Sequence, residues 1–502
     1  MEGLNTEIDH NEDSHFGYVS HKGTQEETVQ QLLPSDSTTF KTAAPTLLRE
    51  IAGSGYIMAH HNSTRWQIIC EKLQPIAEGD ATFEDVVETI SFFANDQQFQ
   101  SRYRRKQTAP AVFMLDEFFK KLDEQERIAY QTTFLPRLAQ LILETETLFP
   151  NDKRISIFTQ DENRIGSLSK RQCACIIAHM VFCITVDQPE DFMLAELIDF
   201  SVIYTKPGLI KNTARKIHKI KCIFTYLERI LNENPQGNVI FERVFLQGTH
   251  NEDTWADCDE TITSAEIIVK GSIEDTKDAL QVVFSDKELG DQVLQLPTTQ
   301  QQIMSLIHPE LLLTILLFEK LQKEETVRVY GAGRYSNYKG YGDSFEFVEA
   351  YKEEKHEIER QHVIMDAEKY TSKQGASQFA ASWVLREINK AYSGFIQEED
   401  KGRKVATGKW GCGVFKGNPQ LKFIIQWLAA SRAYRDIVFY SYGDETSFNN
   451  EETQKILKHY TGKEVGELFK DLIKAARNMQ IDSDTGDENK NLFRVLIAQN
   501  EL

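Results

Sequence analysis

The chain has 502 residues, of which 41% are hydrophobic, and a formal net charge of −19. This hydrophobic content excludes a largely disordered chain. The chain is long enough for two folded units. The negative charge argues against direct nucleic-acid binding, because contacts to phosphates need Lys and Arg side chains. No apolar run approaches the ~18 residues of a membrane span, and the N-terminus lacks the apolar segment of a secretory signal.

The seven cysteines are scattered along the chain. Cys173 and Cys175 lie in an apolar run, where free thiols act as small hydrophobic side chains, and no second pair completes a zinc site. The adjacent His60 and His61 diverge on a helix or a strand, so they are poor joint ligands. We therefore expect reduced cysteines, no metal, no cofactor, and an intracellular protein, either cytoplasmic or nuclear.

Four segments follow one another along the chain. We expect a polar acidic tail over residues 1–44, a helical accessory domain over 45–236, an α/β domain over 237–480, and a C-terminal tail over 481–502. The predicted fold class is therefore α+β: helices first, then a domain with a mixed central sheet. A short basic run at 102–106 is either a solvated surface or a docking patch for an acidic partner.

The helical region carries two local signals. Thr82 and Asp85 form a capping-box pattern at the start of a helix. Further helices are expected over residues 126–149, 168–186 and 213–231, where apolar residues recur at spacings of three and four.

From residue 237 the pattern changes to short strands that alternate with helices. Strands are expected over residues 238–246, 264–271, 279–284, 326–331, 344–350, 362–367 and 436–443. Helices are expected over residues 309–322, 379–392, 419–434 and 451–479. Such alternation indicates a largely buried sheet with helices packed against it.

Three segments have the composition of ligand-binding loops. Glycines alternate with aromatic residues in VYGAGRYSNYKGYG (329–342) and in ATGKWGCGVFKGN (406–418), and IVKGSIEDTKDALQVVF (268–284) is a strand pair with an acidic turn. Glycine lets backbone approach a ligand closely, and an aromatic ring offers a flat face. Taken alone, these patterns fit a ligand site or tight turns with packed rings.

Taken together, the segments resemble the poly(ADP-ribose) glycohydrolase family from about residue 60 to about residue 478. The matching text is LSKRQCACIIAHMVFC, KIKCIFTYLERI, GSIED, HPELLLTILLFEKL, GAGRYSNYKGYG, REINKAYSGF, VATGKWGCGVF and DIVFYSYGD. The resemblance implies a helical region followed by a macrodomain, and hydrolysis of the ribose–ribose bond by a carboxylic acid that protonates the leaving oxygen. The family signature is Gly-Gly-Gly followed by Gln-Glu-Glu, whose second Glu is the acid.

This signature is degenerate here. The Gln-Glu-Glu falls on Gln300, Gln301 and Gln302, so the resemblance puts an amide in the place of the catalytic carboxylate. The Gly-Gly-Gly falls on Gly290, Asp291 and Gln292. Three further family residues, an Asp and two Asn, are replaced by Val283, Asp286 and Lys409. An amide cannot act as a general acid, and a change of this whole neighbourhood indicates natural loss of activity.

Other positions still match the family. The resemblance assigns the adenine end of ADP-ribose to Ile273, Glu274, Tyr341 and Phe415, beside the loop glycines Gly411 and Gly413. These residues remain either for a ligand or for packing. Glu288, Asp291 and Glu310 are carboxylates near the lost signature, and Glu310 has a structural explanation at a helix start, where it favours the helix dipole.

The first hypothesis is a catalytically inactive glycohydrolase homologue that acts as a scaffold subunit of an intracellular protein assembly, cytoskeletal or axonemal among the candidates. The second is a non-cleaving protein that binds ADP-ribose or poly(ADP-ribose). The third is an active glycohydrolase with an unrecognised acid.

Overall fold

The computed structural model describes residues 56–57, 63–96, 112–149, 155–184, 200–204, 211–290, 294, 298–352, 360–370, 377–397, 402–448, 450–483 and 491–501. The described residues belong to one compact unit that begins at Pro45. The predictions for the tail 1–44, for His60 and His61, for the basic run 102–106, and for Asp291 and Gln292 lie outside the described residues. Among the described helices, none has the length and apolar character needed to cross a membrane.

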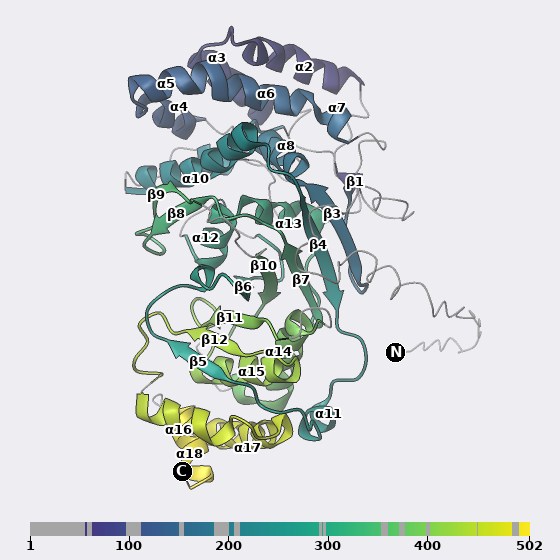
Figure 1. Cartoon of the computed structure of the whole chain (residues 1–502), viewed down its shortest axis with the longest axis vertical. Helices are drawn as coiled ribbons and strands as arrows, with labels where there is room; N and C mark the ends of the chain where they lie inside the picture. The colour runs from purple at the N-terminus through teal and green to yellow at the C-terminus, as the bar shows by residue number, and fades with distance from the viewer. Residues whose placement is uncertain are drawn as a thin grey trace, which may run out of the picture. The chain divides into compact units, whose positions relative to one another are not determined.

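The first half of the chain is mostly helical, as expected (Figure 1). Its helices are α2 (Ser63–Glu78), α3 (Phe83–Asn95), α4 (Phe113–Lys120), α5 (Glu124–Ala129), α6 (Leu135–Leu143), α7 (Thr145–Leu148), α8 (Lys170–Val181), α9 (Ser201–Tyr204) and α10 (Lys211–Glu233). The capping box at the start of α3 is confirmed, with reciprocal hydrogen bonds between Thr82 and Asp85. The helical run predicted over residues 126–149 is confirmed from Glu124 to Leu148, with a π-helical turn at Tyr130–Phe134 inside it and one turn residue, Glu144, before α7.

The central sheet has eight strands in the order β3-β4-β7-β10-β6-β11-β12-β5. Their bounds are β3 Arg164–Ser169, β4 Asn238–Phe245, β5 Ala265–Ile268, β6 Ala279–Ser285, β7 Glu325–Tyr330, β10 Gln361–Asp366, β11 Lys404–Gly408 and β12 Ile437–Tyr440. The pairs from β3 to β10 are antiparallel, and those from β10 to β5 are parallel. The expected mixed sheet, after a helical region, is therefore confirmed.

Both faces of this sheet are buried. Adjacent side chains of a strand point to opposite faces, so neighbouring residues enter different cores. On β6, Val282 belongs to one hydrophobic core and Val283 to the other. On β10, Val363 and Ile364 divide in the same way. The core that includes Val283 and Ile364 also contains the apolar sides of α8 and α10, whereas the other contains α14 (Ala381–Phe395) and α15 (Pro419–Arg432).

The expected boundary at residues 236/237 does not separate helices from sheet. β3 lies within the predicted helical domain but pairs with β4 along its whole length. Its sequence is polar, so it carries no alternating apolar pattern, and it forms because β4 offers an unpaired edge. The helical region thus supplies one edge strand of the sheet.

Two other expectations changed in the structure. The strand predicted over 344–350 becomes β9 (Glu346–Ala350), which pairs with β8 (Ser336–Lys339) in a separate hairpin. The helix predicted over 309–322 is a 3₁₀ turn at Pro309–Leu313 followed by α13 (Thr314–Leu317). It stops there because the Phe158 N–H donates to the Leu317 carbonyl and the Glu319 N–H donates to the Phe158 carbonyl, which draws Phe318 into an extended bridge.

The C-terminal tail predicted over 481–502 is also wrong. The predicted helix 451–479 divides into α16 (Asn450–Tyr460) and α17 (Val465–Ser483), with Gly462 at positive φ between them. α18 (Leu492–Gln499) then packs against α16 and α17. Its Leu492, Phe493 and Leu496 are buried, so the end of the chain belongs to the core.

Candidate functional site

The degenerate signature lies at the N-terminus of α12 (Gln300–Ile307), next to the carboxyl end of β6. Each of the three glutamines is engaged with the protein itself. The Gln300 amide accepts from the Phe284 N–H at 2.8 Å and donates to the Val282 carbonyl at 3.0 Å. The Gln301 Nε2 donates to the Ser285 hydroxyl at 3.0 Å. These side chains therefore hold α12 against β6.

Gln302 closes the first turn of α12. Its Oε1 accepts from the Thr299 N–H at 3.2 Å, and Thr299 caps the helix in return, which makes a capping box. The same oxygen accepts from the Lys219 amine at 3.3 Å. Both side chains are buried, and burial lowers the pKa of Lys219 to about 7. The amide of Gln302 thus stabilises a helix end and partners a buried amine.

The other signature residues that the structure describes also have structural roles. Gly290 has φ of +72°, and a Cβ there would lie 2.1 Å from Ile315 Cγ1, so close packing alone requires glycine. Val283 is buried in the core. Asp286 is half-buried, and its carboxylate accepts from the Lys287 N–H at 2.7 Å.

The glycine- and tyrosine-rich segment 329–342, here called the tyrosine loop, contains β8 and leads to the tip of the β8–β9 hairpin, which lies beside α12. The Gly342 N–H donates to the Thr298 carbonyl at 2.8 Å, and the Tyr341 hydroxyl contacts the Gln300 backbone. Arg215 of α10 forms an ion pair with Asp343 at 2.8 Å. The Tyr341 side chain remains 61% exposed, so the tip presents an aromatic ring above the N-terminus of α12.

Ile273 and Glu274 lie on a 3₁₀ turn at Ile273–Asp275 after β5. Both are buried, and the Tyr338 hydroxyl of β8 donates to the Glu274 carboxylate. Burial raises the pKa of Glu274, and the hydrogen bond from Tyr338 opposes this rise. Arg334 fixes the turn from the tyrosine loop, with a hydrogen bond to the Glu274 carbonyl at 3.3 Å.

The WGCG loop, residues 409–418, follows β11. Trp410 is fully buried, whereas Phe415 is half-buried and Gly413 is exposed, with open space where a Cβ would stand. Lys409, at the position of the family's Asn, turns towards Asp444 at 3.5 Å. The structure therefore brings this loop to the same carboxyl edge of the parallel strands as α12, which is where open α/β sheets bind ligands.

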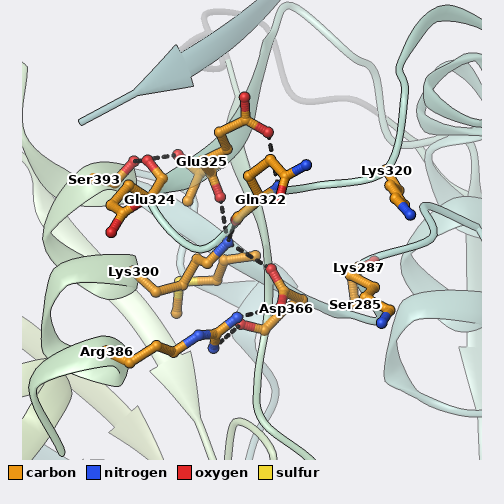
Figure 2. Close-up of polar contacts among 12 residues, drawn as sticks. Ser285, Lys287, Lys320, Gln322, Glu324, Glu325, Asp366, Arg386, Lys390 and Ser393 are labelled. Atoms are coloured by element: carbon orange, nitrogen blue, oxygen red, sulfur yellow. Dashed lines mark hydrogen bonds and ion pairs between the residues drawn. The ribbon is translucent and has the colours of Figure 1, made fainter. Parts of the chain in front are cut away.

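A buried network of charges lies at that edge (Figure 2). Asp366 ends β10 directly opposite Ser285 of β6 and pairs with Arg386 and with Lys390, the latter at 2.6 Å. Figure 2 shows the Lys390 amine between Asp366 and the strand β7, where it donates to the Glu325 carbonyl at 2.6 Å. Burial would raise the pKa of Asp366, but the two cations hold it below its ordinary value.

The network continues towards the WGCG loop. Glu387, the neighbour of Arg386 on α14, pairs with both Arg386 and Lys422, and the Lys422 amine lies 4.1 Å from the centre of the Trp410 ring. All four side chains are buried. One chain of charges therefore supports both the loop that carries Phe415 and the strand end that carries Ser285.

The carboxylates near α12 differ in their surroundings. Glu310 is buried, pairs with Lys170 at 3.2 Å, and accepts from the Tyr335 hydroxyl at 2.6 Å. Glu288 is exposed on the loop after β6. Within the described ranges no group of three or more His, Cys, Asp or Glu side chains has the arrangement of a metal site.

Sequence reasoning missed three contributors to this region: Lys219, Arg215 and the Asp366 network. The charged residues of α10 and α14 lie on amphipathic helices, where charges usually face solvent, so nothing local marked them as buried. The capping role of Gln302, in contrast, had a signal, because Thr299 precedes it by three residues.

The two hollows that stand out on the described surface lie elsewhere. One, of about 690 Å³, lies between α3 and α4, and the other, of about 300 Å³, lies between α16 and α18.

Comparisons with known proteins agree with this architecture. A family model described as "Poly (ADP-ribose) glycohydrolase (PARG), helical domain" matches residues 122–243, and one described as "Poly (ADP-ribose) glycohydrolase (PARG), Macro domain fold" matches residues 252–449. Together they cover more than half of the chain.

Individual relatives carry the same family name. A probable poly(ADP-ribose) glycohydrolase 2 of Arabidopsis thaliana is 27% identical over 500 residues, which covers 85% of this chain and 94% of the relative. Poly(ADP-ribose) glycohydrolase 1 of Caenorhabditis elegans is 28% identical over 348 residues, which covers 66% of this chain and 42% of the relative. With a helical region, a mixed eight-stranded sheet and these matches, the chain belongs to the poly(ADP-ribose) glycohydrolase family.

Proposed function

We propose that this protein is a member of the family that does not hydrolyse poly(ADP-ribose). The observation that carries the proposal is Gln302, the residue that the resemblance assigns to the catalytic acid. Its amide has no proton to give at neutral pH, and its oxygen is already used by the Thr299 N–H and by Lys219. Loss of a general acid typically slows such a reaction by about 10²–10⁴-fold.

The nearby carboxylates are poor replacements. Glu310 is held by Lys170 and Tyr335 in the interior, and Glu288 is exposed to water. Asp291 lies outside the described residues. Glu310 is too enclosed to reach a substrate, and Glu288 lacks the enclosed surroundings that a general acid needs.

One observation favours the opposite view, an active glycohydrolase with an unrecognised acid. Burial lowers the pKa of Lys219 to about 7, which suits proton transfer at neutral pH, and its amine lies 3.3 Å from Gln302. Its complete burial argues against this role, because a general acid must reach the leaving oxygen.

The two views are separated by incubation with labelled poly(ADP-ribose). We expect no release of ADP-ribose over hours from the wild-type protein or from the Lys219→Met variant. Release by the wild type that Lys219→Met abolishes would contradict the proposal and identify Lys219 as the acid. An active relative serves as the positive control.

For the biological role, we propose a structural subunit of an intracellular protein assembly. The side chains of the former cleavage end now serve the fold, which supports selection for the folded surface rather than for turnover. Native extracts should contain the protein in a complex larger than the 57.7 kDa chain, with cytoskeletal fractions among those to examine. A protein that elutes as a free monomer from such extracts would contradict this role.

A second role, a protein that binds ADP-ribose without cleaving it, is supported by Tyr341. Its ring is 61% exposed beside the N-terminus of α12, and a flat ring is enough to stack on adenine, worth about 1–3 kcal/mol. Calorimetry with ADP-ribose tests this role, with Tyr341→Ala as the variant. Absence of heat at millimolar ligand removes it.

A further inference from the structure

The WGCG loop carries a surface that extends beyond Phe415, the one residue of it that the roles above use. The loop packs closely on the segment that follows β10: at Gly411, with φ of +74°, a Cβ would lie 2.7 Å from the Ala367 Cβ. Further along, the Tyr370 N–H donates to the Phe415 carbonyl at 2.9 Å. Residues 367–370 and 411–415 therefore lie side by side.

Aromatic and apolar side chains remain exposed where these segments meet. Val414 is 69% exposed, and Phe415 is half-buried. Trp383, in the first turn of α14, is 37% exposed and packs edge-on against Tyr370, with ring centres 6.3 Å apart. A single exposed apolar residue needs no explanation, but three around one loop form a surface.

Two lysines border the same surface. Lys369 and Lys416 are exposed, and the Lys369 amine lies 5.8 Å from the centre of the Phe415 ring. Neither lysine forms an ion pair with another of the described residues, whereas the acids nearby are engaged: Glu368 with Arg386 and Asp444 with Lys409, each at 3.5 Å. Uncompensated positive charge at this place contrasts with the net charge of −19.

We propose that this surface is a platform for a further unit of an ADP-ribose polymer. The platform consists of Lys369, Trp383, Val414, Phe415 and Lys416, and the proposal rests on the second role above, binding without cleavage. Each unit of the polymer carries a diphosphate and an adenine. Lysines attract the diphosphate, and exposed rings stack on adenine, as in proteins that hold single-stranded nucleic acids.

The platform distinguishes a polymer from a single ADP-ribose. The resemblance assigns the adenine of the first unit to Phe415, at the border of the platform, and the Lys369 amine lies 5.8 Å from the centre of that ring. A protein that does not cut the chain gains affinity from every unit it holds, about 1–3 kcal/mol for each stacked base. That gain corresponds to roughly 5- to 150-fold in the dissociation constant.

The test compares ADP-ribose with a purified ADP-ribose oligomer of defined length, by calorimetry on the full chain. We expect the oligomer to bind at least about 10-fold more tightly than the monomer, with a difference that shrinks as salt rises. The double variant Lys369→Glu/Lys416→Glu and the variant Trp383→Ala should reduce this advantage, and Trp383→Ala should leave monomer binding unchanged. The matched control is Lys458→Glu/Lys474→Glu, which alters two exposed lysines of α16 and α17.

The outcomes separate the platform from the role on which it rests. Equal binding of monomer and oligomer overturns the platform and leaves ADP-ribose binding intact. Absence of binding by either ligand overturns both and leaves the structural role. If the oligomer binds more tightly than the monomer and keeps this advantage in both platform variants, the assignment of these residues is overturned. If a single-stranded oligodeoxyadenylate binds with the same affinity as the ADP-ribose oligomer, the choice of polymer is overturned.

Discussion

The two ends of the candidate site use their side chains differently. At the end assigned to cleavage, Gln300, Gln301 and Gln302 bond to backbone or to buried partners of the same chain. At the end assigned to adenine, Tyr341 and Phe415 keep exposed ring surface. One end is therefore bonded into the fold, while the other keeps exposed aromatic surface.

The largest expected effect follows from breaking the support that both ends share. Asp366→Asn leaves Lys390 buried without its carboxylate and removes one of the carboxylates that surround Arg386, which should lower the free energy of unfolding by about 3–5 kcal/mol. Urea denaturation measures the loss. The control Glu467→Gln removes an exposed pair with Lys463 and should change stability by less than about 0.5 kcal/mol. Equal effects of the two variants would mean that the buried network contributes no more than a surface pair.

Two glycines test the comparison directly. Gly290→Ala at the cleavage end meets Ile315 at positive φ, so it should cost about 2–4 kcal/mol from strain and overpacking. Gly413→Ala at the adenine end meets nothing within 4 Å and should leave the free energy of unfolding almost unchanged. Thermal and urea unfolding of both variants check this. A destabilised Gly413→Ala protein would show that the adenine end is packed as tightly as the other.

Lowering the pH should destabilise the contact between α12 and the tyrosine loop. His308 ends α12 and bonds through Nδ1 to the Gly333 carbonyl of the tyrosine loop at 2.9 Å, and its ring packs edge-on against buried His362 at 4.5 Å. Burial lowers the pKa of His362 to about 3, and the nearby cations Arg360 and Lys170 add to this effect. Burial also lowers the pKa of His308, with a further contribution from His362, Arg360 and Arg334. A His with a lowered folded pKa gives stability that is complete above its unfolded value, near 6.5, and that falls as pH falls.

At pH 5, His362 alone should account for about 2 kcal/mol of lost stability relative to neutral pH. Urea unfolding at pH 7 and pH 5 measures this, and His362→Leu should remove that part of the pH dependence. His459→Gln, at a less buried position on α16, is the matched control. An unaltered pH profile in His362→Leu would show that protonation of other groups controls acid sensitivity.

The smallest effect concerns the cap of α12. Gln302→Ala removes the side chain that accepts from the Thr299 N–H and should cost about 1 kcal/mol. Gln302→Glu keeps the acceptor and adds charge beside the helix N-terminus and Lys219, which should stabilise the protein by about 0.5 kcal/mol. Differential scanning calorimetry resolves both. Destabilisation by Gln302→Glu would indicate that this end cannot accept a carboxylate.

Sequence pattern predicted the elements whose signals are local. The capping box of Thr82 and Asp85 and the apolar strands β6, β10 and β12 lie where they were expected. β11 was missed because its short sequence, Lys404–Gly408, carries a single large apolar residue, Val405, and the helix expected to continue past Leu317 stops because Phe318 pairs with Phe158. Such partners are invisible in a local window.

The sequence predicted where the candidate site lies along the chain but did not predict the contacts that its side chains make. The family signature located Gln302, and a capping pattern was readable from Thr299. Lys219 and Asp366, however, are charged residues whose burial depends on which helix face meets which strand end. Only the assembled fold brings the ammonium of Lys219 to the amide of Gln302.

The contribution of β3 to the sheet has a consequence for how this protein can be divided. A fragment that starts at residue 237 would leave the edge of β4 without its partner from Arg164–Ser169. Unpaired edges recruit strands of other molecules, so such a fragment is expected to aggregate, whereas one that retains β3 should remain dispersed. The helical region and the sheet therefore have to be kept together in any shortened form of the protein.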